Sequence, residues 1–128
     1  MKAAIESKEI VSNEIMADVI IDSMQDLKGS KIVKIDLQKV ADAPAGIFII
    51  CEAESTVKIK GIVNRITENM REECGMRPGH VEGISGAKWM LIDYFSIIVH
   101  VFYPETRDFY DLEGLWSDGE ITEYSSLS

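Results

Sequence analysis

Two stretches of the chain carry apolar residues at the three- and four-residue spacing of an amphipathic helix. The first covers residues 10–27, where Ser12 is suited to cap the start and Gly29 to follow the end. The second begins near Ser55 and ends at Gly75. Its apolar stripe consists of Ile59, Ile62, Val63, Ile66 and Met70.

Five shorter stretches have the pattern of β-strands: residues 31–37, 46–51, 81–84, 88–94 and 96–102. The stretch GIFIIC at 46–51 is continuously apolar, which is typical of a strand buried on both faces. The last two stretches lie too close together to be anything but a hairpin. We therefore predict an α/β fold: a two-layer, mixed β-sheet of about five strands with two main helices on one face.

The predicted hairpin divides its side chains between two faces of the sheet. If Phe95 and Ser96 form the turn, Trp89 pairs with Phe102, and neighbouring positions alternate across the sheet. One face, suited to receive the helices, holds Met90, Ile92, Tyr94, Ile97, Val99 and Val101. The other holds Trp89, Leu91, Asp93, Ile98, His100 and Phe102.

Two interpretations of this second, mixed face stay open, and they are compatible. Apolar patches rimmed with charge mark interaction sites. Alternatively, the C-terminal segment folds back and covers the face. The segment RDFYDLEGLW at 107–116 is the candidate cover, because Leu112, Leu115 and Trp116 have the spacing of a short helical turn. Its aromatic residues in an acidic frame fit a protein interface better than a nucleic-acid groove.

Length and charge indicate one acidic domain. The chain has 128 residues and a net charge of −9, so it favours a basic partner surface over nucleic acid. We expect a single domain over residues 1–118, with 1–11 as an N-terminal extension or helix lead-in and 119–128 as a flexible acidic tail. Two cysteines expected to be reduced, and no apparent membrane or secretory pattern, favour a cytoplasmic protein.

Candidate catalytic groups do not assemble into a known site. His100 could act as a general base with Asp93 as its orienter, but no hydroxyl or thiol nucleophile is evident beside them. The histidines and cysteines lack metal-ligand spacing, and no phosphate-binding glycine motif occurs. We therefore predict no catalytic residue, no metal and no cofactor.

The second half of the chain carries an ordered set of motifs. They are Pro-x-x-x-Glu-Gly at 78–83, Trp-x-Leu-x-Asp-Tyr at 89–94, His-x-Phe at 100–102 and Arg-x-Phe-Tyr-x-Leu-Glu-x-Leu-Trp at 107–116. Their order and spacing resemble the ribosomal silencing factor family, RsfS or Iojap. The resemblance covers residues 12–118 and is tight from Gly75 onward.

The resemblance implies a fold similar to that of nucleotidyltransferases, without their catalytic residues, and a protein that is not an enzyme. Family members bind large-ribosomal-subunit protein fourteen (uL14) at the intersubunit face. They thereby block association of the small and large subunits and repress translation under nutrient limitation or in stationary phase. The same partner, a homodimer in the free state, no sequence-specific nucleic-acid binding and no membrane are therefore expected here.

The resemblance also suggests which residues bind the ribosomal protein. Trp89 and Phe102 are the expected apolar anchors, and Tyr110 and Trp116 are expected to complete the aromatic patch. Three acids are expected to complement positive charge: Asp93, Glu105 and Glu113. His100 is expected to fix a hydrogen bond at this face, and Arg107 either joins the surface or pairs internally with an acid. For the protein as a whole, two other functions stay open: a nucleotidyltransferase-like enzyme with a noncanonical site, and a homodimeric interaction scaffold.

The first half of the chain departs from the family pattern, and so does the hairpin turn. The departing residues are Gly46, Ile47, Glu52, Ala53, Lys58, Phe95 and Ser96. These departures leave open how the chain pairs with a second copy.

Overall fold

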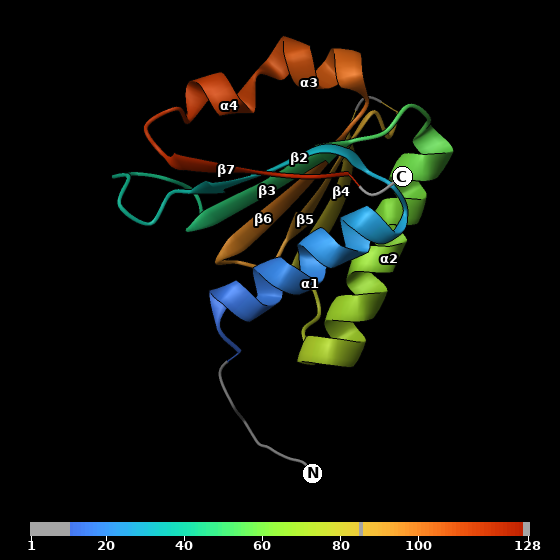
Figure 1. Cartoon of the computed structure of the whole chain (residues 1–128), viewed down its shortest axis with the longest axis horizontal. Helices are drawn as coiled ribbons and strands as arrows, with labels where there is room; N and C mark the ends of the chain where they lie inside the picture. Colours follow the sequence, from blue (N-terminus) through green and yellow to red (C-terminus); the bar gives the residue numbers. More distant parts are fainter. Residues whose placement is uncertain (1–10, 85, 127–128) are drawn as a thin grey trace.

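The computed structural model describes residues 11–84 and 86–126, in which a mixed β-sheet lies between two helical layers (Figure 1). The strand order is β4-β5-β6-β3-β2-β7. The strands are β2 (Ser30–Asp36), β3 (Ile47–Glu52), β4 (His80–Ile84), β5 (Trp89–Asp93), β6 (Ile97–Phe102) and β7 (Glu120–Tyr124). Strands β3 and β6 run parallel, whereas the other four neighbouring pairs are antiparallel.

The two predicted amphipathic helices are confirmed as α1 (Asn13–Asp26) and α2 (Thr56–Cys74), which pack side by side on one face of the sheet (Figure 1). The Ser12 side chain accepts a hydrogen bond from the Ile15 amide, and that of Ser55 accepts one from the Lys58 amide. Gly75 ends α2 with a φ of 64°, a left-handed conformation that costs glycine little. Local cap chemistry therefore sets three of these helix boundaries.

The other face of the sheet is also covered, so the predicted two-layer arrangement is wrong. Helices α3 (Pro104–Tyr110) and α4 (Leu112–Leu115) form a third layer on the side opposite α1 and α2 (Figure 1). Strand β3 explains the need for this layer, because all six of its residues are buried. Without a second cover, Phe48 and Ile50 would expose large apolar side chains to water.

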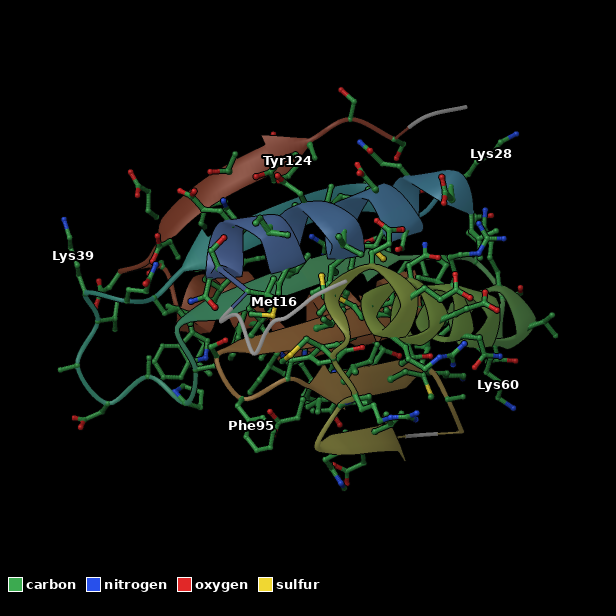
Figure 2. All side chains as sticks on the ribbon, turned by 90° about the horizontal axis from the view of Figure 1, so that it is seen from below. Met16, Lys28, Lys39, Lys60, Phe95 and Tyr124 are labelled. Carbon is green, nitrogen blue, oxygen red and sulfur yellow. The ribbon has the colours of Figure 1, made fainter. Side chains whose placement is uncertain are left out.

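The predicted hairpin register is confirmed. Trp89 lies opposite Phe102, and Leu91 lies opposite His100. The turn places Phe95 at a φ of 72°, and the Asp93 carboxylate accepts a hydrogen bond of 2.7 Å from the Phe95 amide. The Phe95 side chain is 71% exposed and stands at the edge of the molecule (Figure 2).

The expected flexible acidic tail is wrong over residues 120–124, which form β7. This strand pairs with the free edge of β2, and so a sheet expected to have about five strands has six. Beyond it, the Ser125 carbonyl accepts a hydrogen bond from Gln25, and the Ser126 hydroxyl donates to the Gly29 carbonyl. The two acids of this strand, Glu120 and Glu123, interrupt its apolar pattern, so the sequence did not predict it. Of the predicted extension at 1–11, residues 1–10 lie outside the described residues.

None of the described helices is both long enough and apolar enough to span a membrane.

Candidate partner-docking surface

The α3–α4 segment covers the mixed face of the hairpin. Leu112 and Trp116 pack against the buried side chains of Phe48, Ile50 and Phe102. The Trp116 ring meets that of Phe48 edge-on at 6.2 Å between centroids. The predicted short helical turn is therefore confirmed as α4, and the cover interpretation holds for the centre of this face.

Trp89 is held on both sides at the border of this cover. Its ring stacks on Phe102 at 5.0 Å and contacts Tyr110 at 4.6 Å, centroid to centroid. Its indole N–H donates a hydrogen bond of 3.1 Å to Nδ1 of His100. Trp89 is half-buried, so its orientation is fixed while part of its surface stays accessible.

His100 is a buried, neutral side chain. It is 3% exposed, and burial lowers its pKa to about 3. Because Nδ1 accepts the Trp89 hydrogen bond, Nε2 carries the proton, and it has no hydrogen-bond partner among the described residues. Asp93 hydrogen-bonds the hairpin turn instead of His100, so the hypothetical acid–base pair does not form.

Two of the eight predicted docking residues lie inside the protein. Phe102 is fully buried beneath Trp89, and His100 is nearly so. Both therefore support the surface from below and cannot present an anchor to a partner in this conformation. The alternation of the hairpin placed them on the correct face, but it could not show that α3 and α4 bury that face.

Arg107 pairs internally, which settles the alternative left open by the sequence. It is 6% exposed and binds both carboxylate oxygens of Glu113, at 2.7 and 3.2 Å. Burial alone would lower its pKa, but the hydrogen bond to Glu113 and the negative charges of Glu113 and Glu52 outweigh burial and raise it. Glu113 is thus engaged within the protein, which conflicts with its predicted role as a free docking acid.

The accessible apolar side chains of this layer belong mostly to residues outside the predicted docking set. Phe109 is 81% exposed, Leu115 68% and Tyr110 40%. Only Tyr110 was predicted, because the spacing of Leu115 suggested that it packs inward. We define the docking surface by its apolar residues, Trp89, Phe109, Tyr110 and Leu115, and by its exposed acids, Glu105, Asp108 and Asp111.

Metal chemistry finds no support at this surface or elsewhere in the part of the chain that the structure describes. No group of three or more histidine, cysteine, aspartate or glutamate side chains is placed to hold a metal ion there. Cys51 is fully buried, and burial raises the pKa of its thiol to about 12, so it is a poor nucleophile.

Comparison with known proteins gives consistent matches. The family model described as "Ribosomal silencing factor during starvation" matches residues 10–128. The ribosomal silencing factor of Halalkalibacterium halodurans is 28% identical over 117 residues, which is 91% of this chain and 98% of that protein. The factor of Bacillus subtilis is 30% identical, over 77% of this chain and 81% of that protein.

A solved structure agrees with the fold. The crystal structure of a protein from Chromobacterium violaceum superposes with a TM-score of 0.78 and 27% identity, over 84% of this chain and 88% of that one. Because the family model matches nearly the whole chain, the protein belongs to the family of ribosomal silencing factors, which are non-enzymatic, ribosome-binding regulators of translation.

Proposed function

We propose that this protein binds large-ribosomal-subunit protein fourteen at the intersubunit face and so prevents the small subunit from joining. The proposal rests on family membership and on the docking surface. Phe109 and Leu115 are large apolar side chains left in water, and three exposed acids lie in the same short segment. Such a surface fits a basic protein with an apolar socket.

To exclude the small subunit sterically, the protein must bind the large subunit tightly and be large enough to block the joining surface. It does not need to catalyse a reaction. The surface supplies rigid anchors, because Trp89 is held between Phe102 and Tyr110. Aromatic side chains of this kind carry much of the binding energy of protein interfaces. A bound domain of 128 residues then occupies the space that the small subunit needs.

The direct test is co-sedimentation with purified large subunits, followed by a subunit-joining assay. We expect Phe109→Ala to weaken binding about tenfold or more, because it removes an exposed aromatic anchor. The matched control is Val57→Ala, since Val57 is 80% exposed on α2 in the opposite layer. Equal binding by both variants would exclude Phe109 as an anchor, and a wild-type protein that neither binds nor affects joining would overturn the proposal.

The homodimer and the likeness to nucleotidyltransferases stay predictions. Light scattering of the free protein checks the first.

A further inference from the structure

The segment that carries the docking surface is attached to the sheet by two half-buried apolar side chains, Leu112 and Trp116, and by one buried residue. Helices α3 and α4 have seven and four residues, and isolated helices of that length are not stable in water. The buried residue of α3 is Arg107, and α4 has no fully buried residue. A charged side chain therefore makes the deepest contact between this segment and the sheet.

The Arg107 guanidinium joins three separate elements. Its Nη1 donates to the Lys31 carbonyl of β2 at 2.8 Å and to the Glu52 carboxylate of β3 at 3.1 Å. Its Nε and Nη2 donate to Glu113 of α4 in a bidentate pair. We call this set the arginine latch: Arg107, Glu52, Glu113 and the Lys31 carbonyl. Because the guanidinium is planar and its donors are fixed, the latch restrains orientation as well as distance.

The latch also accounts for the exposure of Phe109. Successive residues of an α-helix are rotated by about 100°, so a side chain two positions after Arg107 points to nearly the opposite side. With Arg107 directed into the sheet, Phe109 is directed outward, which agrees with its exposure of 81%. Tyr110 follows at the next position and contacts Trp89. The pairing of one buried arginine thus sets which side chains meet a partner.

We infer that Arg107 is a positioning residue for ribosome binding, acting through the latch without touching the partner. This inference rests on the proposed function of the docking surface. Glu52 is itself 8% exposed, so deleting the arginine would leave a buried carboxylate without its partner. Arg107→Lys is the more informative change, because it keeps the charge and removes the bidentate geometry.

The experiment combines hydrogen exchange with co-sedimentation on large ribosomal subunits. For Arg107→Lys we expect amide exchange over residues 104–116 to quicken about tenfold, and affinity for the subunit to fall about tenfold, because charge-assisted hydrogen bonds are lost. Exchange in β3 and β6 should keep its wild-type rate. Should Arg107→Lys fail to fold, Glu113→Gln removes the α4 side of the latch alone and gives the same two readouts.

Asp26→Asn is the matched control for Glu113→Gln, because it removes one negative charge from an exposed ion pair with Arg65 on the opposite layer. Its exchange and affinity should match those of the wild type. Faster exchange with unchanged affinity would overturn the inference, and so would lower affinity with unchanged exchange, which would make Glu113 a direct contact. Failure of the proposed function is distinct, because the wild type itself would then not sediment with the subunit.

Discussion

At the scale of single residues, burial makes His100 a source of acid sensitivity. Its pKa is about 3 in the folded protein against 6.5 for an ordinary histidine. Between these pH values the unfolded chain binds a proton at this histidine that the folded protein does not bind. The free energy of unfolding is therefore not reduced by His100 above pH 6.5, and it falls as the pH decreases toward 3. The histidine contributes a slope of up to about 1.4 kcal/mol per pH unit in that window.

The variant His100→Asn should remove this contribution. The asparagine side-chain oxygen can still accept the Trp89 N–H, and asparagine does not titrate. Urea unfolding between pH 4 and 7 should therefore show a shallower pH dependence for the variant than for the wild type. Parallel curves for the two proteins would mean that His100 is not buried and neutral as described.

The backbone conformation of Phe95 is a second single-residue feature that affects stability. Its φ of 72° suits glycine, and a side chain there costs about 1–2 kcal/mol. We expect Phe95→Gly to have a higher free energy of unfolding than Phe95→Ala by about 1 kcal/mol, since both lose the ring and only glycine relieves the backbone. Denaturant titration of the two variants measures this difference, and equal values would contradict the left-handed turn.

At the scale of elements, local signals predicted much of the fold. Ser12, Ser55 and Gly75 mark helix ends because capping involves neighbours in sequence, and alternation predicted the register of β5 and β6. The pattern did not predict strand β7, because the acids of this strand interrupt its apolar positions. The sequence pattern did not predict the exposure of Phe109, because this exposure follows from the pairing of Arg107 with Glu52, which is 55 residues away in sequence.

The packing of β7 against the sheet can be tested at Gly119, the residue that precedes this strand. A β-carbon added at Gly119 would lie 2.6 Å from Cγ2 of Ile35 and 2.8 Å from Cδ2 of Leu37. Gly119→Ala should therefore destabilise the protein by about 1–3 kcal/mol and quicken amide exchange over residues 120–124.

The matched control is Gly61→Ala in α2, where the nearest atom to an added β-carbon is Cδ1 of Leu27 at 3.8 Å. There alanine should stabilise the helix by about 1 kcal/mol. If Gly119→Ala is as stable as the wild type, the strand does not pack against β2 as described.

At the scale of the whole molecule, the position of the acids matters more than their number. The protein has a net charge of −9, and exposed carboxylates lie both on the docking segment, as at Glu105 and Asp108, and on α2. Charges beyond about 10 Å are largely screened at 0.1 M salt. A basic partner at the docking surface should therefore sense the acids of α3 and not those of the opposite helical layer.

Binding to the large subunit should therefore depend on the salt concentration. Raising salt from about 50 to about 300 mM should weaken binding by the wild type, because it screens the attraction between rim acids and a basic partner. The double variant Glu105→Gln, Asp108→Asn should bind more weakly and with a shallower salt dependence. The double variant Glu68→Gln, Glu73→Gln on α2 has the same net charge and should follow the wild type. Equal salt dependence in the two double variants would assign the effect to total charge and place the partner away from α3.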